Sequence, residues 1–231
     1  MAKILFVMTG ADQWTLADGS THPTGFWAEE ATVPYEAFKA AGHEVTVATP
    51  GGVVPPVDPA SLSPEANGGA ENAAAVRGAV EGAAEFRSPV ALADVRLDGF
   101  DAVYVPGGHG PMEDLAVDAD SGRLLARAVE SGLPVGVVCH GPAALLAATK
   151  DDGTNAYAGY RITAFTNTEE RQAGHAEKAK WLLQDRLTEA GLKVEAREPW
   201  APHIEADRNV VTGQNPASSG PLAAELLKKL G

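Results

Sequence analysis

Short apolar runs recur along the chain, and each is too short to form a typical helix. The first is Lys3–Thr9 (KILFVMT), followed by His43–Thr49 (HEVTVAT), Asp101–Val105 (DAVYV) and Pro134–Cys139 (PVGVVC). Apolar runs of this length are typical of parallel strands that are buried on both faces. Segments of helical length separate them, so the order strand, helix, strand repeats. This order predicts an α/β fold with a mostly parallel central sheet covered by helices on both faces.

The helices are predicted from apolar periodicity and from glycine at their carboxyl ends. The predicted helices are 27–42, which contains Pro34 and could be kinked or divided there, 121–132, 141–148 and 176–191. A further strand is predicted at 160–166, and the last segment, 209–230, predicts a strand, a turn and a terminal helix.

The chain of 231 residues is long enough to bury a substantial core as one domain, so we expect a single domain over 1–231. The segment at about 50–96 is rich in glycine, proline and alanine, with a helical pattern around Ala73–Phe86. We interpret it as an insertion or cap on that domain.

The negative net charge disfavours some classes of binding partner. The formal net charge is −13, with a pI near 4.8, which opposes binding to nucleic acid or to an anionic membrane. A single cysteine excludes an internal disulfide, and the start MAKILFVMTG lacks the layout of a secretory signal. No apolar run approaches the roughly 20 residues that span a bilayer. We therefore expect a cytoplasmic protein whose partners are small molecules or protein surfaces.

The cysteine lies where a strand passes directly into a helix. In PVGVVCHGPAALL the apolar strand ends at Cys139, and Gly141 could permit a sharp turn. Such a turn exposes a nucleophile at the carboxyl edge of the sheet, where ligand sites of open α/β sheets lie. The helix N-terminus that follows would favour the thiolate. The alternative is a small buried core cysteine, which is the commoner situation for an arbitrary cytosolic thiol.

Polar residues near other strand ends could complete such a site. His140 follows the cysteine directly, and the turn PGGHG (106–110) could supply backbone N–H groups to an oxyanion. Glu29 and Glu30 lie among Phe26 and Trp27, where a desolvated carboxyl could stay protonated near neutral pH. The alternatives are ordinary turn chemistry and solvated carboxylates. The other histidines show no metal-ligand spacing and are interpreted as surface or satisfied polar residues: His22, His43, His109, His175 and His203.

The segment PVGVVCHGPAALL resembles the DJ-1/PfpI superfamily, whose members share the class I glutamine amidotransferase-like fold. Five further segments are similar to its glyoxalase III branch, which includes the heat-shock protein thirty-one chaperones. In chain order they are TGFWAEEATVPYEAF, ATPGGVVPPVDPASL, FDAVYVPGGHGPMEDL, RITAFTNTEE and VVTGQNPASS. The resemblance covers most of the chain and implies a flavodoxin-like three-layer α/β/α sandwich and a homodimer.

The resemblance assigns the nucleophile and an acid. Cys139 corresponds to the family nucleophile, and Glu30 corresponds to the acid beneath it. Glu30 is preferred over Glu29 because the family glutamate lies four residues before a proline, which here is Pro34.

The remaining site residues follow from the same resemblance. His140 corresponds to the triad histidine, and Glu170 to the residue that orients it, although the adjacent Glu169 leaves that choice open. The backbone oxyanion donors map onto Gly108 and the amide of His140. Trp27, next to the acid, could line the substrate pocket.

The implied activity is a hydro-lyase reaction on a small 2-oxoaldehyde. Cys139 would add to the aldehyde of methylglyoxal, Glu30 would move a proton between the two former carbonyl carbons, and hydrolysis would release lactate. The resemblance implies no metal, glutathione or nicotinamide cofactor, and the chain has no Gly-x-Gly-x-x-Gly or Walker motif.

Other functions of the same fold stay open. A glutamine amidotransferase would use a late His-x-Glu, and PHIE (202–205) has that form, but the residues around the cysteine lack the glycines and glutamine typical of that class. A holdase chaperone or a redox sensor would use Cys139 through oxidation or not at all. A Cys-dependent deglycase or amidohydrolase would use the same residues on a larger substrate.

Overall fold

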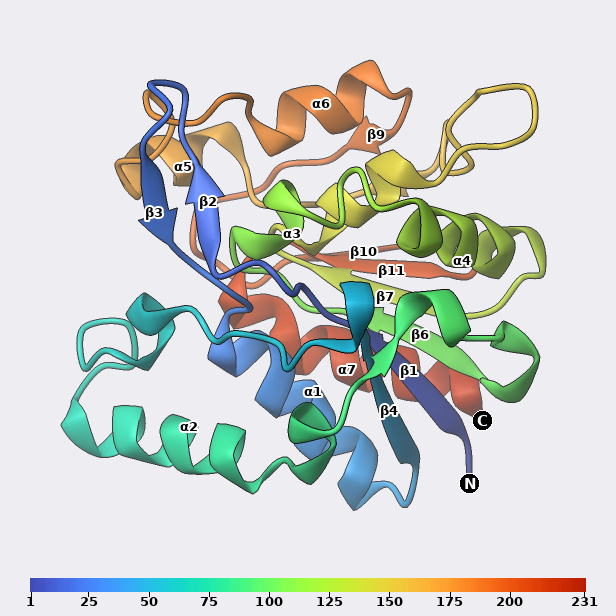
Figure 1. Cartoon of the computed structure of the whole chain (residues 1–231), viewed down its shortest axis with the longest axis horizontal. Helices are drawn as coiled ribbons and strands as arrows, with labels where there is room; N and C mark the ends of the chain where they lie inside the picture. The colour runs from blue at the N-terminus through green and yellow to red at the C-terminus, as the bar shows by residue number, and fades with distance from the viewer.

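The computed structural model describes all residues, 1–231, and its centre is a seven-stranded sheet (Figure 1). The strand order is β10-β11-β7-β6-β1-β4-β5, and every neighbouring pair is parallel except β10 with β11. The strands are β1 (Lys3–Val7), β4 (Glu44–Thr49), β5 (Val90–Ala91), β6 (Ala102–Val105), β7 (Val135–Val138), β10 (Ile204–Asp207) and β11 (Val210–Gly213). The predicted parallel sheet is therefore confirmed, with one antiparallel strand at its edge.

Helices cover both faces of this sheet (Figure 1). Helices α1 (Ala28–Ala40) and α7 (Ser219–Leu230) pack against each other on one face, and α4 (Ala119–Glu130) lies on the other. The shorter helices are α3 (Gly110–Glu113), α5 (Asn167–Gln172) and α6 (Leu183–Glu189). The three-layer α/β/α class is thus confirmed.

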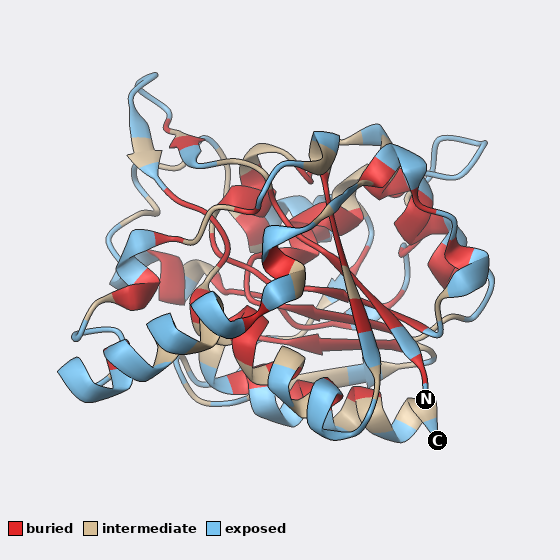
Figure 2. Cartoon of the chain, turned by 60° about the horizontal axis from the view of Figure 1, so that its bottom comes forward, coloured by how far each residue is buried: buried red, intermediate tan, exposed pale blue.

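The core is centred on the parallel strands, which Figure 2 shows as a buried interior beneath mostly exposed helix faces. Phe6 of β1 contacts Tyr104 of β6 and Phe38 of α1, with ring centroids 4.8 Å and 6.0 Å away. All three side chains are inaccessible to solvent. Each such aromatic contact adds to the free energy that burial contributes, so this face of the sheet holds α1 in a fixed position.

Pro34 lies inside α1 without dividing it. Proline has no N–H, so the carbonyl of Glu30, four residues earlier, loses its helical hydrogen bond. The hydroxyl of Tyr104 donates to that carbonyl at 2.6 Å instead. A buried acceptor is therefore satisfied from the central sheet, which ties the backbone of Glu30 to β6.

The segment 50–96 holds α2 (Ala70–Gly82) and several 3₁₀ turns, and it ends by adding β5 to the sheet edge. Helix α2 packs on the outer side of α1. The 3₁₀ turns of the chain are Pro50–Gly52, Pro59–Leu62, Ala84–Arg87, Leu92–Asp94, Leu97–Gly99, Gly141–Ala147 and Pro216–Ser218.

Three sequence predictions were wrong in detail. The predicted strand at 160–166 is only β8 (Arg161–Ile162), and it pairs with β9 (Lys193–Val194) outside the central sheet. The predicted helix at 176–191 is helical only from Leu183, and 141–148 is a 3₁₀ helix. The hairpin of β2 (Gln13–Thr15) and β3 (Thr21–Pro23) was not predicted, because neither strand has an apolar run.

The carboxyl ends of the parallel strands β1, β6, β7 and β11 meet at one edge of the sheet (Figure 1). Cys139 follows β7, and the Gly107–Gly108 pair follows β6 at this edge. Helix α1 also begins at this edge, since the N–H of Trp27, the residue before it, donates to the Gly107 carbonyl at 3.0 Å. No helix of the chain is both long enough and apolar enough to cross a membrane.

Candidate active site

Cys139 occupies a strained turn directly after β7. Its φ is 59°, in the left-handed region that costs a non-glycine residue about 1–2 kcal/mol. Its N–H donates to Gly213 at 2.9 Å, and its carbonyl accepts from Phe165 at 2.9 Å, so both sides of the turn are fixed. Strained backbone conformations of this kind are found most often at functional sites.

The glycine after the turn has a different role from the one expected. The left-handed residue is Cys139 itself, whereas Gly141 is needed because a Cβ at this position would lie 2.6 Å from the carbonyl oxygen of Val105. The absent side chain lets the first turn of the 3₁₀ helix pack against the end of β6.

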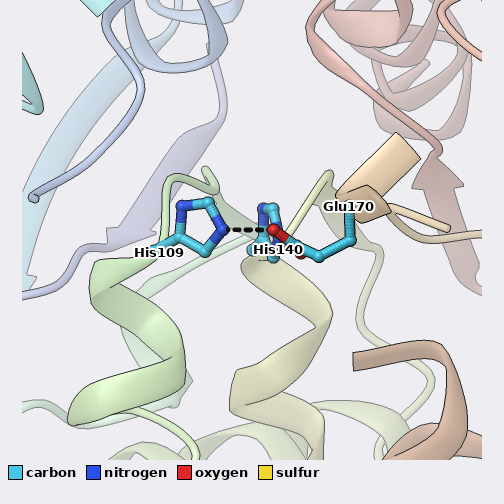
Figure 3. Close-up of side chains that lie close together, drawn as sticks. All are labelled: His109, His140 and Glu170. Atoms are coloured by element: carbon cyan, nitrogen blue, oxygen red, sulfur yellow. Dashed lines mark hydrogen bonds and ion pairs between the residues drawn. The ribbon is translucent and has the colours of Figure 1, made fainter. Parts of the chain in front are cut away.

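The predicted triad residues come together around the sulfur. His140 Nδ1 lies 3.3 Å from Cys139 Sγ, and His140 Nε2 lies 2.7 Å from Glu170 Oε2 (Figure 3 shows the histidine beside this carboxylate). All three side chains are buried. The imidazole is thus held between a thiol and a carboxylate, which is the arrangement that lets a histidine accept a proton from a nucleophile.

Glu170, and not Glu169, contacts the histidine. The Oε1 atom of Glu169 accepts from the Asn215 amide and the Trp200 N–H, each at 2.9 Å, and from Gln214 at 3.2 Å. Its Oε2 atom accepts from the N–H and hydroxyl of Thr166 in a capping box at the start of α5. Glu169 therefore connects loops through hydrogen bonds, whereas Glu170 is the glutamate that lies beside the imidazole of His140.

Glu30 lies in the first turn of α1 with no solvent exposure. Its Oε2 atom accepts the Gly107 N–H at 2.9 Å. Its Oε1 atom is buried without a partner of regular hydrogen-bond geometry, and the thiol of Cys139 is the polar side chain with which the carboxyl interacts. Glu29, one residue earlier, is only partly buried, so the expectation that Glu30 lies beneath the cysteine agrees with the geometry.

Burial shifts the pKa values of the Glu30 carboxyl and the Cys139 thiol. Loss of solvent raises the pKa of Glu30 to about 8, against the opposing effects of the neighbouring Cys139 thiol and of the hydrogen bond from the Gly107 N–H. Burial, and then the nearby Glu30 charge, raises the pKa of the Cys139 thiol. This effect of burial opposes the stabilisation of a thiolate that was expected from the helix N-terminus.

The two predicted oxyanion donors have no oxygen acceptor within the protein. The N–H groups of Gly108 and His140 donate to no backbone or side-chain oxygen. The Gly108 N–H instead faces the sulfur and opposes the rise in its pKa. A Cβ at Gly108, whose φ is +89°, would lie 2.3 Å from the carbonyl oxygen of Gly25, so only glycine allows this approach.

A cavity of about 150 Å³ leads to the sulfur and the imidazole. Its lining is mostly apolar and aromatic, with Trp27, Phe165 and Trp200 among its walls, and it contains no lysine or arginine. Asp58 is the one carboxylate in the lining. Trp27 thus lies where the sequence suggested, whereas Trp200, at a φ of 64°, was not recognised, because no local pattern marks a loop that folds back over the site.

His109 was also missed as a site residue. Its Nε2 atom lies 2.9 Å from Glu170 Oε1, on the carboxylate oxygen that His140 does not use (Figure 3). Its place in the glycine-rich turn after β6 was the available signal. Single ligand atoms of His109, His140 and Glu170 lie within 4.8 Å of one another, a spacing that could hold a metal ion, but both histidine Nε2 atoms are already hydrogen-bonded to the Glu170 carboxylate.

The late His-x-Glu is separate from this site. His203 Nε2 lies 3.2 Å from Glu205 Oε1, and neither residue contacts Cys139. The histidine beside the sulfur is His140, so the expectation that PHIE does not provide the triad agrees with the geometry.

Comparison with known proteins places the chain among relatives of the same fold. The bovine glutamine amidotransferase-like class 1 domain-containing protein 1 is 32% identical over 142 residues, which span 62% of this chain and 64% of that protein. The protein/nucleic acid deglycase HchA of Staphylococcus aureus is 28% identical over 95% of this chain and 77% of its own length. The structure of glyoxalase III from Candida albicans superposes with a TM-score of 0.79 at 24% identity, covering 99% of this chain and 97% of that chain. A model of the DJ-1/PfpI family matches residues 22–229, and the chain therefore belongs to the DJ-1/PfpI family.

Proposed function

We propose that the protein is a glutathione-independent glyoxalase that converts methylglyoxal and water to lactate. The observation that carries this proposal is the buried pair of Cys139 and Glu30, in which a nucleophile interacts with an acid whose pKa is raised to about 8. Isomerising a 2-oxoaldehyde needs a nucleophile for the aldehyde and a group that both gives and takes a proton on carbon. A carboxyl with a pKa near neutrality can do both.

The first step forms a hemithioacetal. The sulfur of Cys139 attacks the aldehyde carbon while its proton passes to His140 Nδ1, which lies 3.3 Å away. The aldehyde oxygen, held near the N–H groups of Gly108 and His140, takes the proton of Glu30. The site then holds an imidazolium, stabilised by Glu170, and a carboxylate at Glu30.

The second step moves hydrogen between the two carbons. The carboxylate of Glu30 removes the proton from the former aldehyde carbon while His140 protonates the ketone oxygen, giving an enediol. Glu30 then protonates the second carbon, and the hydroxyl on the first carbon returns its proton to His140. The product is a thioester of lactate on Cys139, with His140 charged and Glu30 ionised.

Hydrolysis restores the resting protonation. Water attacks the thioester and gives a proton to Glu30, and the sulfur leaves and takes the proton of His140. Lactic acid departs and ionises in water, so the sum is methylglyoxal plus water to lactate and a proton. No external oxidant or reductant is needed, because one carbon is reduced as the other is oxidised.

The cavity supports a small uncharged substrate. A volume of about 150 Å³ is well below the ~300–1,000 Å³ of sites for drug-sized ligands. A lining without lysine or arginine offers no permanently charged cation to a phosphate or carboxylate group on the substrate. Methylglyoxal, which is small and neutral, fits both conditions.

A deglycase is the second candidate, because the Staphylococcus aureus relative bears that name. It would use the same thiol on an aldehyde adduct of an amine. The small cavity favours the free aldehyde, since only the adduct end of a larger substrate could reach the sulfur.

The test is lactate formation from methylglyoxal by the purified, reduced protein without glutathione. We expect turnover in the intact protein and in Glu29→Gln, and its loss in Cys139→Ala and Glu30→Gln. Glu29 is the matched control, because it adjoins Glu30 on the same helix without contacting the sulfur. Absence of lactate from the intact protein, or equal loss in both glutamate variants, would contradict the proposal. Faster release from a preformed amine adduct would favour the deglycase.

A further inference from the structure

The carboxylate of Glu170 is held by two histidines, one on each oxygen. His140 Nε2 lies 2.7 Å from Oε2, and His109 Nε2 lies 2.9 Å from Oε1 (Figure 3). The Glu170 side chain is 3% exposed, and that of His109 is 13% exposed. Three elements thus meet at one carboxylate: the turn after β6, the turn after β7, and α5.

An ionised carboxylate can only accept hydrogen bonds, so both Nε2 atoms must carry hydrogen. The two histidine bonds lower the pKa of Glu170 against the opposing effect of burial, which keeps the group ionised. In neutral His140 the Nδ1 atom is then bare and faces the thiol at 3.3 Å. This is the tautomer that can accept the thiol proton, and it depends on the orientation of Glu170.

His109 is itself held rigidly. Its ring stacks on Trp14 of the β2–β3 hairpin, with centroids 4.2 Å apart and planes inclined by 20°. The ring centroids of His109 and His140 lie 4.1 Å apart. Burial, and then the His140 charge, lowers the pKa of His109. Glu170 and Asp58 oppose this shift of the His109 pKa, and the His175 ring centroid lies 5.2 Å from that of His109. The lowered pKa favours the neutral form of His109, which can still donate its Nε2–H to Glu170.

We propose that His109 is a positioning residue of this site: its Nε2–H fixes the second oxygen of Glu170 and so selects the reactive tautomer of His140. The inference deepens the proposed glyoxalase activity and rests on it for its kinetic readout only. The Trp14 contact, by the same argument, makes the otherwise separate hairpin part of the support for the triad.

Two substitutions separate hydrogen bonding from packing. His109→Phe keeps a planar ring against Trp14 but cannot donate, whereas His109→Gln can place an amide N–H near the position of Nε2 without the stacking. We expect kcat for methylglyoxal to fall by about 10–100-fold in the Phe variant, with KM changed less than about twofold. The Gln variant should retain kcat within about threefold.

The second readout needs no substrate. Nitrogen NMR of histidine-labelled protein reports which ring nitrogen of His140 carries hydrogen, with the signal assigned by His140→Asn. We expect the Nε2–H form in the intact protein and in His109→Gln, and a mixture of tautomers in His109→Phe. Equal kcat in all three proteins, or an unchanged His140 signal in the Phe variant, would overturn the role of His109. If the intact protein forms no lactate, the proposed function fails, and the NMR comparison still decides this inference.

Discussion

His140 Nε2 and Glu170 Oε2 lie 2.7 Å apart, although 30 positions separate the two residues in the chain. The contact exists because the Phe165 N–H, shortly before α5 begins at Asn167, donates to the Cys139 carbonyl at the end of β7. Glu169 and Glu170 leave the same helical turn in different directions, one toward the Asn215 loop and the other toward the imidazole. Two adjacent buried carboxylates thus have separable roles.

Glu170→Gln should remove activity without unfolding the protein. The amide can accept on only one oxygen and directs an N–H₂ group at a histidine donor, so the imidazole loses its fixed tautomer. We expect kcat for lactate formation to fall about a hundredfold or more. Circular dichroism and a urea midpoint close to those of the intact protein are the control, and near-normal turnover would remove Glu170 from the site.

Glu169→Gln should instead lower stability. Glu169 accepts five hydrogen bonds in a fully buried position, and a glutamine would direct an N–H₂ group at one set of these donors. We expect the free energy of unfolding to fall by about 1–3 kcal/mol or more in urea titrations. A stability equal to that of the intact protein would show that these bonds contribute little.

Glu30 should make stability depend on pH. Its carboxyl has a pKa raised from 4.5 to about 8 in the folded protein. Below pH 4.5 the group is protonated in both the folded and unfolded states, so it imposes no penalty. Between pH 4.5 and 8 the unfolded chain releases this proton and the folded chain retains it. The free energy of unfolding should therefore fall by about 1.4 kcal/mol per pH unit from this group, and level off above its folded pKa.

The measurement compares Cys139→Ala with Cys139→Ala/Glu30→Gln, which removes the coupled thiol from both proteins. The difference in their free energies of unfolding, taken from urea titrations at pH 5, 6, 7 and 8, cancels the contribution of every other titrating group. It should change steadily over this interval, with the glutamate protein losing stability relative to the glutamine protein. Two parallel pH profiles would mean that the Glu30 pKa is not raised.

Gly108→Ala should damage both the fold and the site. The added Cβ would lie 2.3 Å from the Gly25 carbonyl oxygen and would force the candidate oxyanion donor away from the sulfur. Gly19→Ala is the matched control, because Gly19 has a similar φ of +82° and nothing within 4 Å of a Cβ. We expect about 1–2 kcal/mol lost in the control from backbone strain alone. Gly108→Ala should lose more stability and most of the turnover, and equal behaviour of the two variants would contradict the account.

The sequence was sufficient where local pattern and tertiary environment agree. The apolar runs at β1, β4, β6 and β7 predicted the parallel sheet, since only strands buried on both faces need such runs. Cys139 was found from its strand-to-helix context. The β2–β3 hairpin was missed, because its two strands lie outside the central sheet and lack an apolar run.

The parts of the site that sequence could not give are contacts between distant segments. His109 was interpreted as an ordinary polar histidine, since no neighbouring residue in the chain indicates its contacts with Glu170 and Trp14. The raised thiol pKa was also missed. Proximity to a helix start is visible in sequence, whereas complete burial against Glu30 is not. The resemblance assigned Cys139, His140, Glu30 and Glu170, whereas the contact of His109 with Glu170 follows only from the fold.

The central claim is that Cys139 carries the substrate through a thioester, and acid-quenched turnover followed by peptide mass spectrometry tests it most directly. During steady turnover of methylglyoxal we predict a lactoyl adduct on the peptide that contains Cys139 in the intact protein. We predict no such adduct in Glu30→Gln, where the proton on carbon cannot move. Lactate production by Cys139→Ala at the rate of the intact protein, with no adduct on the Cys139 peptide of the intact protein, would contradict the claim.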